Sequence, residues 1–375
     1  MKNKEMMMLL TPGPTPVPEF VRKAMSDVTI HHRTEEFEAI FKNTRELLLE
    51  LYGMPEAVML ASSGTGAMEA CVTNLTHKKA LTINSGKFGE RFGKICAAFG
   101  IDYTEIKNEW NTPVSVEAVV EAVKNDSSID AIFIQICESA GGLRHPVEQI
   151  AAEVKKINKD IMIIADGITA VGVEKIDTTN LDAVVTGSQK ALMLPPGLAM
   201  IGFSNEAVAK IESKPRGYYF NLATEIKKQR TNTTAWTAAT TLIIGLGAIL
   251  EKLKADGFES LYTKTALRAK ATQEALKAIG FEIYPKTPAN AMTTVYTEQS
   301  SAIRKVLKNK YNVNIAGGQD HLAGKIFRIN HMGLVEDYEA AWAVNAVELA
   351  LDDLGIRTFD GTANKVFASN MFKGN

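Results

Sequence analysis

The chain of 375 residues carries 42 Lys and Arg against 43 Asp and Glu, which gives a formal net charge of −1. A charge so close to zero provides no field suited to a nucleic-acid backbone, so we expect no nucleic-acid partner. The apolar share of 46% and the charged share of 23% are typical of a globular protein, and the length favours one large domain with a smaller one.

The first apolar stretch, Met6–Leu10, follows Lys2 and Lys4 but meets Pro12 too early to be the core of a signal peptide. The longest charge-free run, residues 231–250, is about as long as a membrane span. Six Thr and one Asn lie in it, mostly in its first half. We therefore expect a loop that leads into a buried helix, no membrane partner and a cytoplasmic location.

Short apolar runs alternate with helical patterns between residues 56 and 204. The runs expected to be strands are Val58–Ala61, Ala80–Ile83, Ile129–Ile136, Ile161–Ala165, Ala183–Thr186 and Met200–Phe203, with helices such as Val116–Lys124 and Val147–Ile157 between them. This rhythm predicts an α/β fold whose mainly parallel sheet is covered by helices on both faces. Ligands of such sheets bind at the carboxyl ends of the strands.

The pattern changes after an expected buried helix near Ala238–Leu250. The elements predicted beyond it are helices at Leu261–Ala278, Ile303–Lys310 and Glu336–Leu354, and strands at Met292–Tyr296 and Lys325–Ile329. They indicate a smaller α+β domain over residues 255–375. It would follow an N-terminal arm of residues 1–20 and a large domain of residues 21–254.

A glycine-rich turn, Ser62-Ser63-Gly64-Thr65-Gly66, joins the Val58–Ala61 run to a helical pattern. Glycines let backbone N–H groups approach an anion, and a helix N-terminus adds a favourable dipole, so the segment suits a single phosphate. The P-loop ending GK[ST] is missing, and a purely structural turn stays an alternative.

Asp166 follows the Ile161–Ala165 run directly. An unpaired charge at the end of a buried strand costs several kcal/mol, so this carboxylate needs a partner. It is either a turn residue that caps the backbone or a carboxylate paired with a cationic ring nitrogen.

Lys190 ends the segment Gly187-Ser188-Gln189-Lys190, which follows the Ala183–Thr186 run and precedes Pro195-Pro196-Gly197. A lysine on a loop is usually just solvated. Between a buried strand and an apolar stretch, however, little water stabilises the ammonium. Its pKa then falls, and the free amine becomes available for Schiff-base chemistry.

Six short motifs in one order resemble the class V aminotransferases, which depend on pyridoxal 5′-phosphate (PLP). The closest likeness is to the alanine–glyoxylate, serine–pyruvate and archaeal-type aspartate aminotransferase branch. The motifs are Thr11–Thr15 (TPGPT), His31–Thr34 (HHRT), Ser63–Gly66 (SGTG), Gly86–Phe92 (GKFGERF), Gly187–Lys190 (GSQK) and Gly317–Arg328 (GGQDHLAGKIFR). The resemblance implies a PLP-dependent transferase of fold type I, with a seven-stranded sheet in the large domain.

The resemblance also implies roles for single residues. Lys190 would bind PLP covalently and move a proton at the substrate's α-carbon, and Asp166 would keep the pyridine nitrogen protonated. Phe88 falls where the family stacks an aromatic ring on the cofactor, although it could be a plain core residue. Ile168 would also contact the cofactor, and Ser139 would keep a hydroxyl for the ring oxygen.

The phosphate group of the cofactor would lie on Ser63, Gly64 and Thr65, with Gln189 beside it. In this family the neighbouring subunit completes the phosphate site, which implies a homodimer with shared active sites. The matching residues are Thr234 and Thr237, or Thr231 and Thr234 if the alignment shifts by three.

Arg328 matches the arginine that binds the substrate's α-carboxylate. A guanidinium fits a carboxylate with two parallel hydrogen bonds, which Lys325 could not reproduce. A surface arginine on a strand is the alternative. Gly13 and Pro14 would close the site from the N-terminal arm.

Two segments depart from the family pattern. Relatives often have Glu-Thr-Ser-Thr-Gly where this chain has Glu138-Ser139-Ala140-Gly141-Gly142, so two hydroxyls are lost. Asn330 stands where a close relative would have Gly. Both changes bear on the identity of the substrate rather than on the cofactor.

Three alternatives remain beside the aminotransferase reading. A cysteine desulfurase needs a cysteine in the second half of the chain, and Cys71, Cys96 and Cys137 all precede it. The cysteines are odd in number, and no two of them lie close together in the sequence, which also argues against disulfides and a zinc site. We therefore expect no metal. An aminoethylphosphonate–pyruvate transaminase differs around Lys190. A catalytically inactive phosphate-binding or regulatory protein is the alternative outside enzymes.

The motifs place one arginine for a carboxylate, with Arg33 as the only nearby candidate for a second. An unpaired buried charge discriminates strongly between substrates, whereas an open pocket does not. We therefore expect alanine or serine as the amino donor and glyoxylate or pyruvate as the 2-oxo acid, with aspartate as the alternative donor.

Overall fold

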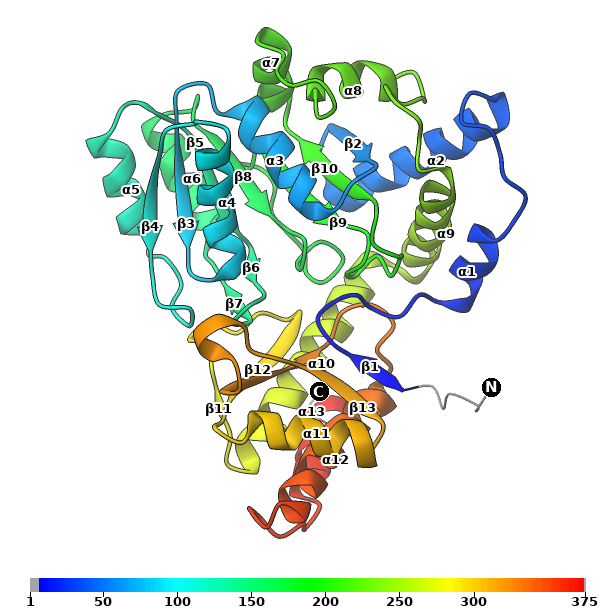
Figure 1. The fold of residues 1–375 in the computed structure, drawn as a ribbon, viewed down its shortest axis with the longest axis vertical. Helices are drawn as coiled ribbons and strands as arrows, with labels where there is room; N and C mark the ends of the chain where they lie inside the picture. Colours follow the sequence, from blue (N-terminus) through cyan, green and yellow to red (C-terminus); the bar gives the residue numbers. More distant parts are fainter. Residues whose placement is uncertain (1–6, 374–375) are drawn as a thin grey trace.

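The computed structural model describes residues 7–373, so the first six residues of the expected N-terminal arm lie outside the described part. Two sheets organise the molecule, with the seven-stranded sheet above the five-stranded one in Figure 1. In spatial order the larger sheet contains β2 (Glu56–Leu60), β10 (Ala199–Phe203), β9 (Ala183–Gly187), β8 (Met162–Asp166), β5 (Ile129–Gln135), β3 (Lys79–Asn84) and β4 (Tyr103–Lys107).

The larger sheet is mainly parallel, which confirms the expected fold class. Only β10 is reversed, because it runs antiparallel to both β2 and β9. Six of the strands fall on the expected apolar runs. The seventh, β4, lies at the edge and alternates between exposed and half-exposed residues, so its sequence lacks the apolar run of a buried strand.

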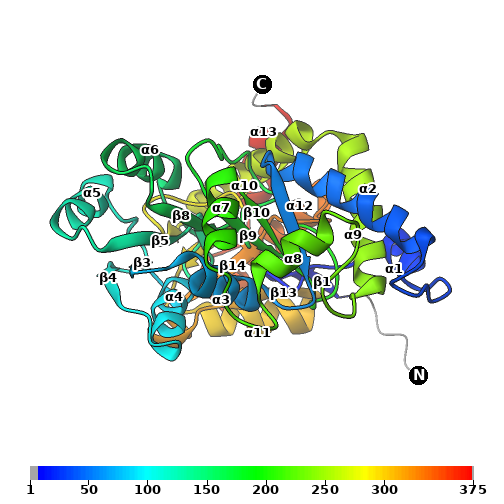
Figure 2. The same cartoon turned by 90° about the horizontal axis from the view of Figure 1, so that it is seen from above.

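Helices cover both faces of this sheet. Successive residues of β5 point to opposite faces, so Ile132 and Phe133 enter two separate cores. One core is covered by α2 (Glu35–Tyr52), α5 (Val116–Asn125), α6 (Val147–Ile157) and α9 (Thr240–Asp256). The other is covered by α3 (Gly64–Leu75), α4 (Lys87–Ala98), α7 (Asn205–Ser213) and α8 (Leu222–Gln229). Figure 2 shows α3 and α4 on one side of the strands and α5 and α6 on the other.

The smaller sheet combines the two ends of the chain. Its order is β1 (Met8–Leu10), β13 (Val313–Gly317), β14 (Ile326–Asn330), β12 (Met292–Tyr296) and β11 (Glu282–Ile283), with β1 parallel to β13. The helices around it are α10 (Phe258–Ala278), α11 (Ser300–Lys310), α12 (Asp337–Asp353) and α13 (Thr362–Phe372). Leu10 is buried in the same core as Phe327 and Val344, so the start of the chain belongs to this part.

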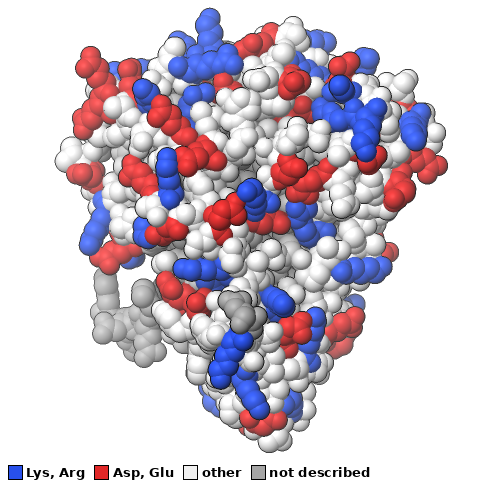
Figure 3. Space-filling model, turned by 180° about the vertical axis from the view of Figure 1, so that it is seen from behind, with Lys and Arg blue, Asp and Glu red and all other residues white. Residues whose placement is uncertain are grey.

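The expected boundary near residue 255 falls where α9 ends at Asp256 and α10 begins at Phe258. That the two parts are separate domains stays a prediction. The charge-free run at residues 231–250 is a loop followed by α9, as expected. Within residues 7–373 no helix is long and apolar enough to cross a membrane. The face seen in Figure 3 carries positive and negative side chains interspersed.

The fold brings the expected site residues to one edge of the larger sheet. Asp166 ends β8, and Lys190 follows the end of its neighbour β9. β5 is followed by the short hairpin of β6 (Cys137–Glu138) and β7 (Leu143–Arg144), which carries Ser139. Parallel strands end at the same edge, which is where such sheets bind ligands.

Candidate active site

Lys190 has the electrostatic surroundings expected of a reactive amine. Burial lowers the pKa of its ammonium to about 8, and the positive charge of Arg328 adds to this effect. Loss of hydration disfavours the charged form, so a substantial share of the amine is neutral near that pH.

The N-terminal arm covers this lysine. The Lys190 amine donates a hydrogen bond to the carbonyl oxygen of Pro12, and the Thr15 hydroxyl donates to the backbone oxygen of Lys190 at 2.6 Å. A Cβ added to Gly13 would lie 2.6 Å from the lysine Nζ. Gly13 therefore lies directly over the amine, whereas Pro14 is exposed.

Asp166 is a carboxylate with few partners. It is 4% exposed, and the one hydrogen bond that the described residues give it comes from the N–H of Ile168, at 2.9 Å. Burial raises its pKa to about 6, although this bond and the charges of Arg91 and Lys190 oppose the shift. A buried carboxylate with a single neutral donor leaves room for a cationic partner.

The glycine-rich turn after β2 leads directly into α3, a geometry that suits the binding of an anion. α3 begins at Gly64, so the N–H groups of its first turn have no partner within the helix. Ser63 is exposed, and Gln189 approaches from the β9 side with its Oε1 buried and unpartnered. A Cβ added to Gly187 would lie 3.1 Å from that oxygen.

Arg91 is a charged residue of this site to which the sequence motifs gave no role. Its Nη1 donates to the Thr65 hydroxyl at 2.8 Å, and its guanidinium lies 4.7 Å from the centre of the Phe88 ring. The positive charge adds to the attraction of the helix N-terminus for an anion. Phe88 itself is half-buried at the start of α4 rather than enclosed in a core. The spacing of Phe88 and Arg91, one helical turn apart, was the signal that could have revealed the pair.

Arg328 lies in β14 and is 8% exposed. Its Nε and Nη2 donate to the carbonyl oxygen of Gly317 at 3.1 and 2.6 Å, and its Nη1 donates to that of Ser139 at 2.6 Å. Of the five N–H donors of a guanidinium, these contacts leave one on each terminal nitrogen, enough for a carboxylate. Burial lowers the pKa of Arg328 to about 10.

Asn330, the departure beside this arginine, uses its amide group for hydrogen bonds within its own turn. Its amide nitrogen donates to the carbonyl oxygen of Met332 at 2.9 Å, and its Oδ1 accepts the Met332 N–H at 3.1 Å. The side chain is fully buried in this turn. The Asn330 side chain therefore stabilises the local backbone.

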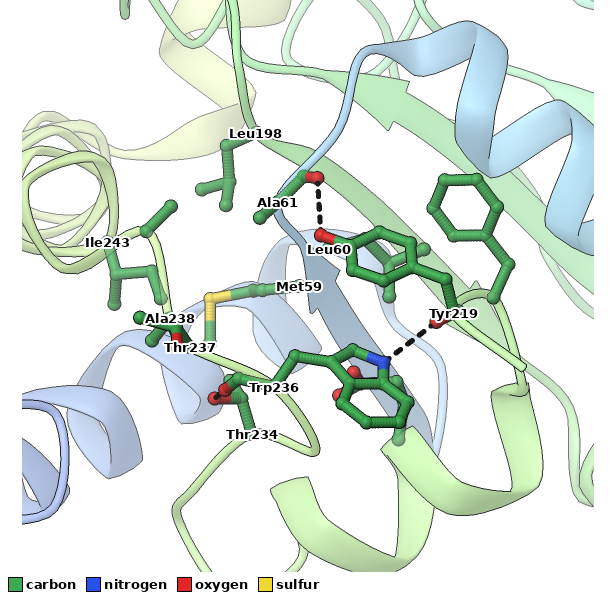
Figure 4. A pocket seen from close by; sticks show the side chains of 13 residues that line it. Met59, Leu60, Ala61, Leu198, Tyr219, Thr234, Trp236, Thr237, Ala238 and Ile243 are labelled. Atoms are coloured by element: carbon green, nitrogen blue, oxygen red, sulfur yellow. Dashed lines mark hydrogen bonds between the residues drawn. The ribbon is translucent and has the colours of Figure 1, made fainter.

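Thr234 and Thr237 lie in another part of the structure. They line a pocket beside the end of β2, together with Met59, Leu198, Tyr219 and Trp236 (Figure 4). Thr234 donates to the Trp236 carbonyl oxygen at 2.5 Å. Thr237 is exposed, as is Thr231, which donates to the carbonyl oxygen of Lys228. Neither Lys190 nor Asp166 lines this pocket, so the structure does not join the threonines to the site within one chain.

Arg33 belongs to the same surface as these threonines. Its Nη1 donates to the Thr233 hydroxyl at 2.7 Å and to the Thr234 carbonyl oxygen at 3.2 Å. The guanidinium is exposed. The positive charge of Arg33 therefore lies beside the Thr233–Thr234 loop.

The family model of the class V aminotransferases matches residues 8–333. The chain belongs to the class V aminotransferases.

Three relatives of this aminotransferase show how far the likeness extends. An "uncharacterized aminotransferase" of Helicobacter pylori is 47% identical over 98% of this chain and 100% of that protein. The serine–glyoxylate aminotransferase of Methylorubrum extorquens is 27% identical over 94% of this chain and 93% of that protein. The solved structure of a subgroup IV aspartate aminotransferase from Thermus thermophilus has a TM-score of 0.86 and 29% identity, over 92% and 99% of the two chains.

The residues present fit PLP, the cofactor that this aminotransferase family implies. Within the described part of the chain the carboxylate of Asp166 accepts one hydrogen bond, from Ile168, so it can accept another from a protonated ring nitrogen. The buried Oε1 of Gln189 has no partner within the described chain, and Arg91 adds a positive charge beside Thr65. The charges of Asp166 and Arg91 also act on the Lys190 amine and influence its pKa.

Proposed function

We propose that this aminotransferase uses PLP, bound covalently by Lys190, to move an amino group between a small amino acid and a 2-oxo acid. The observation that carries the proposal is the cluster of half-buried Lys190 with buried Asp166 and Arg328, in which the lysine amine has a pKa of about 8 because of burial and the nearby arginine. Such an amine is a nucleophile and a base at moderate pH.

Each residue of the cluster has one task in the proposal. Bound PLP supplies an electron sink for negative charge at the substrate's α-carbon. Lys190 removes and returns the proton at that carbon. Asp166 keeps the ring nitrogen protonated, and Arg328 binds the α-carboxylate with its two remaining N–H groups. Gly13 and Pro12 cover the amine and exclude water from one side.

Reduction of the purified protein with borohydride tests the assignment of Lys190. The protein should be yellow, and reduction should fix the cofactor on the peptide that contains Lys190. Lys190→Ala should abolish both the label and turnover. A label on another lysine, with Lys190→Ala still active, would show that the assignment is wrong. A colourless wild type that takes up no added PLP would favour the inactive phosphate-binding alternative.

Asp166→Asn tests the second member of the cluster. The variant keeps the shape of the side chain but cannot stabilise a protonated ring, so proton removal at the α-carbon should slow by orders of magnitude. Cofactor uptake should persist. Turnover close to that of the wild type would mean that another group protonates the ring.

Alanine or serine is the proposed donor and glyoxylate or pyruvate the proposed acceptor. The likeness to a serine–glyoxylate aminotransferase supports this choice. The likeness to an aspartate aminotransferase structure favours aspartate as the second candidate, and Arg33 is the residue that would bind its side-chain carboxylate.

Comparison of kcat/KM for alanine, serine and aspartate decides between these donors, in the wild type and in Arg33→Ala. The small-donor proposal predicts no large preference for aspartate and little change of specificity in the variant. An aspartate preference of about a hundredfold, lost in Arg33→Ala, would overturn it, since a site that hydrogen-bonds a substrate group discriminates at least that strongly against substrates that lack the group.

A further inference from the structure

Glu138 is a fully buried carboxylate to which the proposed reaction gives no task. It is 0% exposed and lies in β6, directly before Ser139. Its Oε2 accepts hydrogen bonds from the N–H groups of Phe88, at 3.0 Å, and Gly89, at 2.8 Å. Its Oε1 accepts from the N–H of Ala140 at 2.9 Å.

Two of these donors belong to the first turn of α4. The N-cap of this helix is Gly86, which has no side chain to cap the free N–H groups. A Cβ at Gly86 would lie 2.5 Å from the carboxylate carbon of Glu138. The space left by the glycine is thus filled by a carboxylate from a distant segment, which caps the helix and carries the charge that a helix N-terminus favours.

Glu138 also interacts electrostatically with charged groups of the site. Burial raises its pKa to about 7, and the negative charge of Asp166 adds to this effect, while the three N–H groups oppose it. In turn, the charge of Glu138 opposes the lowering of the pKa of Arg328 that burial causes. The next residue, Ser139, supplies the carbonyl oxygen that accepts a hydrogen bond from Arg328.

We propose that Glu138 is a positioning residue that fixes the start of α4, which carries Phe88, against the Ser139 segment that holds Arg328. The ring-stacking side chain and the carboxylate-binding side chain are thereby kept at a set separation. This role rests on the proposed function and adds to it a residue that touches neither cofactor nor substrate.

Glu138→Gln tests the role, because the amide keeps the size but turns one oxygen into an NH₂ group that faces N–H donors. The control is Glu348→Gln, which also removes an ion pair with Arg357. Glu348 is also 0% exposed and also accepts two N–H groups at a helix start, those of Thr362 and Ala363 in α13. Glu138→Asp, which keeps the charge on a shorter side chain, is measured in the same way and replaces Glu138→Gln if that variant does not fold.

The first readout is amide hydrogen exchange in the protein without cofactor. At pH 8, above the Glu138 pKa of about 7, Glu138→Gln should speed exchange in the peptide of residues 86–92 by about tenfold, the effect of losing a charged hydrogen bond. Glu348→Gln should instead affect residues 361–366 and leave residues 86–92 unchanged. The second readout is binding: Glu138→Gln should weaken PLP binding and raise KM for the amino donor by about tenfold each, more than kcat falls.

Unchanged exchange at residues 86–92 in Glu138→Gln would overturn the proposal. So would a lower unfolding temperature with PLP affinity and KM like those of the wild type, since that result indicates a purely structural residue. If wild-type protein takes up no PLP, the proposed function fails, and exchange in the cofactor-free protein still decides whether Glu138 holds α4.

Discussion

At the scale of single residues, the amine of Lys190 owes its pKa of about 8 first to burial and second to Arg328. Only the neutral amine attacks a carbonyl. Labelling of the cofactor-free protein by pyridoxal and borohydride should therefore rise with pH and be half-maximal near pH 8. Arg328→Met removes the positive charge, so the pKa of Lys190 rises and the midpoint moves to higher pH.

Mass spectrometry of the Lys190 peptide separates this lysine from those on the surface, and Lys190→Ala gives the background. A wild-type midpoint near the ordinary lysine value of 10.5 would contradict the assigned environment. A midpoint near pH 8 that does not move in Arg328→Met would assign the whole effect to burial.

Asp166 links the same site to stability. Burial raises its pKa from 3.8 to about 6, so between these values the folded chain keeps a proton that the unfolded chain loses. The stability that this group contributes is present below about pH 4 and is lost as the pH rises through about 6. Without cofactor at pH 8, Asp166→Asn should be more stable than the wild type by roughly 2–3 kcal/mol.

Thermal unfolding of both proteins at pH 4 and pH 8, with and without PLP, checks this expectation. The difference should shrink at pH 4, where the carboxyl is protonated in the folded chain. Added PLP should stabilise the wild type more than the variant. A difference that is the same at both pH values would show that the asparagine acts through packing instead.

At the scale of secondary structure, sequence patterns predicted the elements with strong apolar periodicity. The helix expected at Val147–Ile157 has those bounds, and the six apolar runs are strands. The strands β1 and β13 were not expected. β1 has 3 residues and pairs with β13, about 300 residues away, so its formation depends on that pairing more than on local sequence. β13 also pairs with β14.

The residues of the candidate site also differ in how far the sequence predicts them. Asp166 and Lys190 could be predicted because each stands at the end of an apolar strand, where one residue carries the signal. The contacts of Arg91 with Thr65 and of Glu138 with Phe88 join segments that are far apart in sequence. A single sequence gives no register between such segments, so these contacts became visible only in the fold.

The N-terminal arm is an element whose place in the site can be tested at Gly13. Its φ of +106° favours glycine, and an added Cβ would lie 2.6 Å from the Lys190 amine. Gly13→Ala should therefore displace the arm or the lysine and lower kcat/KM by about a hundredfold or more, because small misplacements at a reacting centre have effects of this size.

Gly280→Ala is the matched control. Gly280 has a φ of +94° but no atom within 4 Å of an added Cβ. Both variants should lose about 1 kcal/mol of stability from backbone strain, measured by denaturant unfolding. Only Gly13→Ala should lose activity. Equal activity in the two variants would show that the arm does not set the position of Lys190.

At the scale of the whole molecule, contacts between the two parts surround the site. Lys87 at the start of α4 forms an ion pair with Asp320 at 2.8 Å, and the rings of Trp110 and His321 lie 4.6 Å apart. The arm between β1 and α1 (Glu19–Met25) runs from the smaller sheet past Lys190. The smaller part supplies Arg328 from β14, and the larger part supplies Lys190 from the loop after β9. The candidate site therefore combines groups of both parts.

A proposed homodimer explains why Thr234 lies away from Lys190 in its own chain. A two-fold axis would bring the Thr234 loop of each subunit to the site of the other, where it completes the phosphate site.

In a hybrid of one Lys190→Ala chain and one Thr234→Val chain, one site then lacks both residues, and the other keeps both. The hybrid should show about half of the wild-type activity, although Lys190→Ala alone is inactive and Thr234→Val alone binds PLP weakly. If Thr234 instead served its own chain, each site of the hybrid would lack one residue, and the activity would not exceed half of that of Thr234→Val. Two affinity tags on co-expressed chains isolate the hybrid, and sedimentation establishes its mass. A monomer that retains PLP tightly would contradict the shared site.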